Sequence, residues 1–132
     1  MPFYKSIRIR ATDTLFSRYI RLRDKECSFK HKCYGHQTFD ELQCCHFHSR
    51  RKENVRFDPE NADAGCVKCH YFIDQTAEGQ RWLKEFKKKQ LGERAYDLLE
   101  LRSSISTKKD DVSTITYVKG LIASLPPAQV SH

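Results

Sequence analysis

Two pairs of cysteines frame a short histidine-containing segment, and this frame limits what the chain can fold into. The first pair is Cys27 and Cys33, and the second is Cys66 and Cys69, with His70 directly after it. A tetrahedral zinc ion needs about four such ligands, usually supplied as two short knuckles distant in sequence. Two residues separate Cys66 from Cys69, which is the regular gap, whereas five separate Cys27 from Cys33. The pattern predicts a zinc ion that holds the two segments together.

Alternatives to this ligand set follow from the wide first knuckle. Either His31 or His36 lies close enough in sequence to replace Cys33 at the metal. Cys44 and Cys45 are adjacent, and neighbouring residues of a strand point to opposite faces, so we expect them to pack and not to bind the ion. The competing interpretation of all these thiols is that they are simply buried.

Composition sets the size of the core and the kind of partner. The chain has 132 residues, 39% of them hydrophobic, and its mean hydropathy is -0.72. Such a chain can bury a modest core that a metal would usefully supplement. We expect a core over residues 1–75 and a helical extension over residues 76–132. The net charge of +7 and the pI near 9.2 make a polyanionic partner plausible.

The sequence also indicates the compartment. No apolar run approaches the ~20 residues of a membrane span. The first residues lack the apolar stretch of a secretory signal, so the six cysteines are expected to be reduced and the protein cytoplasmic, without a membrane partner.

Helix and strand patterns surround the cysteine frame. Thr12 or Asp13 can cap a helix that runs to about Asp24. Residues 39–48 suit a β-hairpin whose second strand carries the histidines. Further along, Asp58 followed by a proline is typical of a helix start.

The second half of the chain is predicted to be helical. A helix begins near His70 or Thr76 and runs to Gln90, and Gly92 ends it. A further helix covers residues 93–103, and a last amphipathic segment covers residues 112–125. Trp82 and Phe86 have helical spacing and are expected in the core.

Three residues near the frame combine the groups that phosphodiester hydrolysis needs. If the two knuckles share one zinc, His46 faces His70 across a small cleft. An imidazole has a pKa of about 6.5 and can take a proton from water. A divalent cation can neutralise the charge that develops at phosphorus, and imidazole nitrogen can hold it. The amide of Asn61 can donate and accept hydrogen bonds at once, as a support for the base requires.

Segments of the chain resemble a known family. Residues 42–50 (LQCCHFHSR), 55–61 (VRFDPEN) and 66–70 (CVKCH) are similar to the HNH, or ββα-metal, nuclease motif. The most similar form is the NinG/Rap group of lambdoid phage recombination proteins. The helical tail is similar too, at residues 80–86 and 92–100, so the resemblance extends over roughly residues 12–125.

The resemblance implies a fold and an activity. The fold is α+β, a small zinc-stapled ββα-metal core with an N-terminal helix and a C-terminal helical tail. The activity is that of a metal-dependent DNA endonuclease acting on branched or recombination-intermediate DNA in the cytoplasm of a phage host, with a homodimer as one arrangement. His46 would be the general base, Asn61 would hold the loop in shape, and His70 would bind catalytic Mg²⁺ or Mn²⁺. The cysteines implied as ligands of structural zinc are Cys27, Cys33, Cys66 and Cys69.

One position departs from the family pattern. Many HNH proteins have an acidic metal ligand directly before the first histidine, where this chain has Cys45. The second ligand of the catalytic ion is therefore sought elsewhere, with His48 and Asp63 as candidates, although Asp63 is most simply a solvated helix residue.

Basic residues suggest how DNA is held. Arg50, Arg51 and Lys52 follow the histidines closely and are expected to contact phosphates. The lysines at 87–89 could extend this surface.

Two other functions compete with the nuclease. A non-catalytic, zinc-dependent DNA-binding module would keep the frame without the chemistry, and Cys45 in the acidic position favours it. A protein-interaction adaptor would use the tail helices for docking and would not retain DNA.

Overall fold

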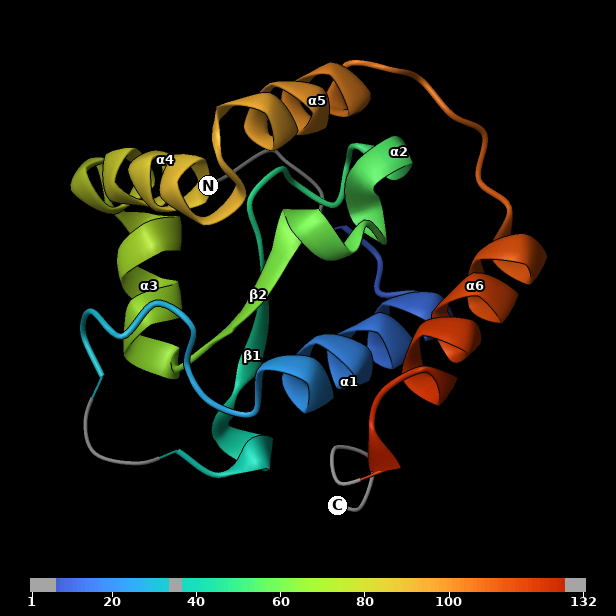
Figure 1. Ribbon diagram of the computed structural model, residues 1–132, viewed down its shortest axis with the longest axis horizontal. Coiled ribbons are helices and arrows are strands. Elements are labelled where there is room, and N and C mark those ends of the chain that lie inside the picture. Colours follow the sequence, from blue (N-terminus) through green and yellow to red (C-terminus); the bar gives the residue numbers. More distant parts are fainter. Residues whose placement is uncertain (1–6, 34–36, 128–132) are drawn as a thin grey trace.

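A two-stranded sheet lies at the centre of the molecule, with helices packed around it. The computed structural model describes residues 7–33 and 37–127, and within these ranges it contains six α-helices and one antiparallel pair of strands (Figure 1). The predicted α+β class is confirmed. The helices and strands are α1 (Ala11–Asp24), β1 (Gln43–His46), α2 (Glu53–Arg56), β2 (Ala62–Gly65), α3 (Val67–Gln75), α4 (Ala77–Leu91), α5 (Glu93–Ser103) and α6 (Asp111–Ala123).

The pairing of the strands differs from the predicted local hairpin. Residues 39–48 contain a 3₁₀ turn, Phe39–Glu41, and a single strand, β1. The partner is β2, in a register that sets Cys45 opposite Asp63 and His46 opposite Ala62. All four residues of β2 are buried, although Ala-Asp-Ala-Gly has low strand propensity. Burial between other elements, and not local preference, makes this segment a strand.

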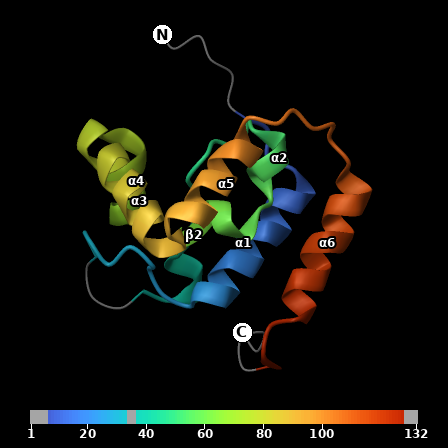
Figure 2. The same cartoon turned by 45° about the horizontal axis from the view of Figure 1, so that its top comes forward.

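The sheet and the helix after it form a ββα unit. The loop that joins β1 to β2 contains α2 and a second 3₁₀ turn, Pro59–Asn61, with Asp58 as its N-cap as predicted. α3 begins directly after β2 and packs against both strands. α1 also packs against both strands, and α6 lies along α1 (Figure 2).

A sharp joint separates α3 from α4, and of the two predicted helix starts, His70 and Thr76, α4 takes the second. The hydroxyl of Thr76 accepts a hydrogen bond from the N–H of Gly79 at 2.8 Å and caps α4. A Cβ at Gly79 would lie 1.8 Å from the carbonyl oxygen of Phe72, so only glycine permits this joint. Gly92, with φ 84°, ends α4 as predicted. The helix predicted over residues 93–103 is confirmed as α5.

The first helix begins slightly earlier than its predicted cap. Arg10 is the N-cap residue, and the carboxylate of Asp13 accepts its backbone N–H at 2.7 Å. Thr12 is buried inside the first turn.

One hydrophobic cluster joins the predicted core and its helical extension. Leu83 of α4 and Val118 of α6 belong to the same buried cluster as Phe16 of α1 and Ala64 of β2. None of the described helices is long and apolar enough to cross a membrane.

Candidate functional site

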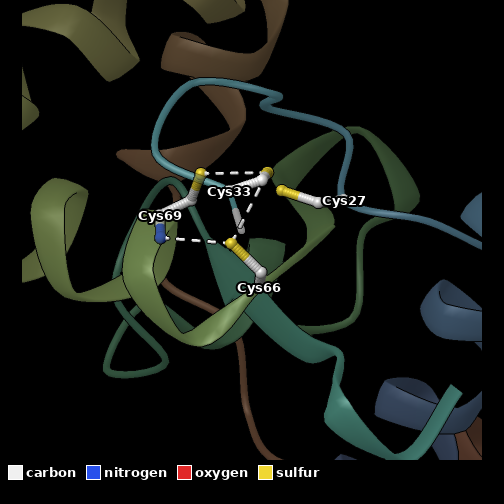
Figure 3. Close-up of side chains that lie close together, drawn as sticks. All are labelled: Cys27, Cys33, Cys66 and Cys69. Atoms are coloured by element: carbon white, nitrogen blue, oxygen red, sulfur yellow. Dashed lines mark hydrogen bonds between the residues drawn. The ribbon is translucent and has the colours of Figure 1, made fainter. Parts of the chain in front are cut away.

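The four framing cysteines lie together at one end of the ββα unit. Cys27 and Cys33 come from the loop after α1, Cys66 caps α3, and Cys69 lies in its first turn (Figure 3). Their sulfur atoms all lie within 4.8 Å of one another, with Cys33 Sγ 3.7 Å from Cys69 Sγ and 3.6 Å from Cys66 Sγ. A zinc–sulfur bond of about 2.3 Å gives sulfur–sulfur distances of about 3.8 Å in a tetrahedron. The cluster therefore fits a metal ion such as zinc.

Backbone groups around the cluster favour thiolate ligands. The N–H of Lys32 points to Cys69 Sγ at 3.1 Å, and the N–H of Cys69 points to Cys66 Sγ at 3.4 Å. Such donors stabilise negative charge on sulfur. Burial raises the pKa of the Cys33 thiol, with further increases from its cysteine neighbours, so a cation is the group that would let all four thiols ionise together.

Of the histidines considered as alternative ligands, the structure describes His31. His31 stacks on Trp82, with ring centroids 4.5 Å apart, and is not a member of the cysteine cluster. His36 lies outside the described residues. Cys45 packs in the core and Cys44 is half-buried, as expected for packing residues.

His46 ends β1 with its ring held on both sides. Its Nε2 lies 2.9 Å from the carbonyl oxygen of Arg56, and its ring centroid lies 5.9 Å from that of Phe16. A carbonyl can only accept, so Nε2 carries the hydrogen and Nδ1 keeps the basic lone pair. Burial lowers the pKa of His46 to about 4, so the ring is neutral at neutral pH.

Asn61 is fully buried and ties the connecting loop together. Its Oδ1 accepts the backbone N–H of His48 at 2.8 Å. Its Nδ2 donates to the carbonyl of His48 at 3.0 Å and to that of Val55 at 3.0 Å. The amide thus uses both of its functions to fix the residues after His46 against α2.

His70 and His46 line the same cleft. The cleft has two parts, of about 630 Å³ and 400 Å³, and His46, His70 and Asp74 line both of them. The Nδ1 of His70 is hydrogen-bonded to the side-chain amide of Gln43, which leaves Nε2 for another partner. Burial lowers the pKa of His70, and Asp74 opposes this change.

The residues considered as a second catalytic-metal ligand lie in different surroundings. His48 lines the smaller part of the cleft, and its Nε2 is 2.8 Å from the carboxylate of Glu100 in α5. Asp63 was expected to be a solvated helix residue, and this is wrong: it is a buried strand residue 2.7 Å from Lys87 Nζ. Apart from the cysteine cluster, the described residues contain no group of three or more His, Cys, Asp or Glu side chains placed so that they could hold a metal ion. The second protein ligand of the catalytic ion stays a prediction.

Two features of the cleft, Asp74 and a buried ion pair, were not predicted from the sequence. Asp74 follows His70 by four residues, a spacing that puts both on one helix face and was available as a signal. Arg56 and Asp13 form a buried ion pair of 2.5 Å beside His46, and no local pattern indicates it.

The predicted DNA-contacting residues lie mostly at the surface. Arg50 is half-buried in the larger part of the cleft, and Arg51 and Lys52 are exposed beyond it. Lys88 and Lys89 are also exposed. The proposed role of Lys87 is wrong, because its ammonium group is buried between α4 and the loop before β2.

Comparison with models of known protein families, with curated proteins and with solved structures gives no significant match.

Proposed function

We propose that this protein is a metal-dependent DNA endonuclease of the HNH type, with a structural zinc ion at the cysteine cluster. The observation that carries the proposal is the state of His46. Its Nε2–H is fixed on the carbonyl of Arg56, which leaves the Nδ1 lone pair to accept a proton, and the ring lines a cleft together with His70. A neutral imidazole with a defined tautomer is what a general base toward water requires.

The cleft offers ligands for a catalytic divalent ion, Mg²⁺ or Mn²⁺. His70 has Nε2 available, and Asp74 lies one helical turn further along the same cleft. Magnesium keeps several of its waters and needs only one or two protein ligands, so the pair fits such an ion. When bound, the ion would neutralise charge that develops on the phosphate. His48 is the less favoured second ligand, because its ring already pairs with Glu100.

In this proposal, zinc bound by the cysteine cluster keeps the segments around the cleft rigid. Cys33 is on the loop before β1, whereas Cys66 and Cys69 begin α3, so zinc would join the two segments that flank the cleft. His46 and His70 would keep their relative positions through that link.

The partner proposed is DNA. The chain carries a net charge of +7, and Arg50 lies in the cleft with His46. Branched or recombination-intermediate DNA, a phage origin and a homodimer stay predictions that rest on the family resemblance alone.

The test is cleavage of linear and branched DNA by the zinc-loaded protein, with and without Mg²⁺ or Mn²⁺. We expect metal-dependent scission by the wild type and a loss of about 10²-fold or more in His46→Gln, because glutamine can donate to the Arg56 carbonyl but cannot take a proton. Exposed Lys108→Gln is the matched surface control. Full activity of His46→Gln, at unchanged zinc content, would refute the proposed base.

A non-catalytic DNA-binding module is the second candidate. It is favoured by Cys45, which occupies the acidic position of the family pattern and is buried away from solvent. This candidate predicts salt-sensitive DNA binding with no scission in either metal, whereas a protein adaptor predicts no retention of DNA at low salt.

A further inference from the structure

Arg21 lies in the cleft that contains His46 and His70, and the fold does not use the two terminal nitrogens of its guanidinium. It belongs to α1 and lines the larger part of the cleft together with Thr14 and Ser17 of the same helix. Its Nε donates to the carbonyl of Ser17 at 3.2 Å and to the hydroxyl of Ser17 at 3.1 Å. None of the residues that the structure describes accepts a hydrogen bond from its terminal nitrogens, NH1 and NH2.

The guanidinium is also oriented by an aromatic ring. Its central carbon lies 4.5 Å from the ring centroid of Phe39, in the 3₁₀ turn before β1. With Nε tethered to Ser17 and one face on the ring, little rotamer freedom remains to be lost on binding. The two free nitrogens form the planar fork that binds phosphate oxygens.

The acidic residues of this cleft do not cancel Arg21. Asp13 is neutralised by a bidentate contact with Arg56, at 2.9 and 2.5 Å. Asp74 belongs to α3, where it interacts electrostatically with His70, and not to α1. Positive charge is therefore the net contribution of α1 to the cleft.

This inference rests on the proposed function: we propose that Arg21 binds a phosphate of the DNA strand that neighbours the phosphate at His46. Phe16 contacts the ring of His46, and Arg21 follows Phe16 by five residues on α1. At 1.5 Å per residue the two side chains leave α1 about 8 Å apart along its axis. The backbone would thus run along α1 from His46 toward Phe39.

The test is the salt dependence of duplex DNA binding in Mg²⁺-free buffer, so that no cleavage is required. Loss of one phosphate contact lowers the slope of log K against log salt by about 0.9. We expect this change in Arg21→Gln, so that its affinity deficit shrinks about 3.5-fold between 50 and 200 mM salt. Arg18→Gln removes the same charge from an exposed position of α1 outside the cleft, and it should keep the wild-type slope.

Zinc content and thermal unfolding report whether the variants are folded. Arg21→Met repeats the test with an uncharged, apolar side chain next to Phe39. A wild-type slope in either folded Arg21 variant, or an equal drop in Arg18→Gln, overturns the proposal. A slope change without any scission by the wild type would instead refute the nuclease and leave this phosphate site standing.

Discussion

At the scale of single residues, the state of His46 depends on an ion pair that belongs to another part of the chain. The carbonyl that receives its Nε2–H is that of Arg56. The guanidinium of Arg56 is held by Asp13 of α1 and donates to the carbonyl of Arg50 at 3.2 Å and that of Arg8 at 3.0 Å. Arg56 is buried with its charge paired, so its backbone has little room to move. The first turn of α1 thereby fixes the tautomer of the proposed base.

His46 makes stability depend on pH in a defined direction. Burial lowers its pKa to about 4, whereas an unfolded histidine titrates near 6.5. Between these values the unfolded chain binds a proton that the folded chain does not, so the free energy of unfolding falls as the pH falls. We expect a loss of about 1.4 kcal/mol between pH 7.5 and 5.5 that is absent from His46→Gln. Urea unfolding of both proteins at the two pH values, at equal zinc saturation, measures it. Equal pH dependence of the two proteins would mean that folding does not lower the pKa of His46.

At the scale of elements, α4 and α5 hold the loop and strand on either side of Asn61. The buried ammonium of Lys87 in α4 lies 2.7 Å from the carboxylate of Asp63 and donates to the carbonyl of Glu60 at 2.7 Å. From α5, Arg102 contacts the carboxylates of Asp58 and Glu60, each at 2.8 Å. The helical extension is therefore part of what positions the loop after His46.

Removal of the buried lysine should be costly. Lys87→Met leaves the carboxylate of Asp63 buried, with Arg23, at 3.8 Å, as its one remaining opposite charge among the described residues. Breaking one partner of a buried pair costs about 3–5 kcal/mol. We expect a loss near the lower figure in urea unfolding, and a change within about 0.5 kcal/mol for Lys88→Met, whose ammonium is at the surface. Similar losses in the two variants would show that the Lys87 pair adds nothing specific.

At the scale of the whole molecule, the cysteine cluster joins segments that are distant in the chain and adds to the contacts of the hydrophobic core. The loop that carries Cys27 and Cys33 contacts α3 through sulfur, and Phe29 of the same loop packs on Trp82 and Phe86 of α4. One metal ion would thus fix the loop, the sheet and the tail helices relative to one another.

Loss of the metal should therefore unfold the protein. A structural zinc contributes about 10 kcal/mol or more, which is comparable to the whole stability of a domain. We expect about one zinc per chain in the wild type. In Cys69→Ser we expect loss of the ion together with the cooperative thermal transition. Cys44→Ser, outside the cluster, should keep both. A sharp thermal unfolding transition in metal-free Cys69→Ser would show that the protein folds without the metal ion.

The sequence by itself determined the features that depend on neighbouring residues. Spacing, capping and backbone preferences within a few positions determine three features. These are the knuckle at Cys66 and Cys69, the end of α4 at Gly92, and the bounds of α5. These local rules work because the interactions they describe form inside a single turn.

Only the tertiary structure decided which distant groups meet. It pairs β1 with an Ala-Asp-Ala-Gly segment of low strand propensity, and it buries Lys87 against Asp63. It also sets His46 on the carbonyl of Arg56, which fixes the tautomer of the ring. Strand pairing across a long loop and burial of charge depend on the whole packed core, and no short window of residues contains that information.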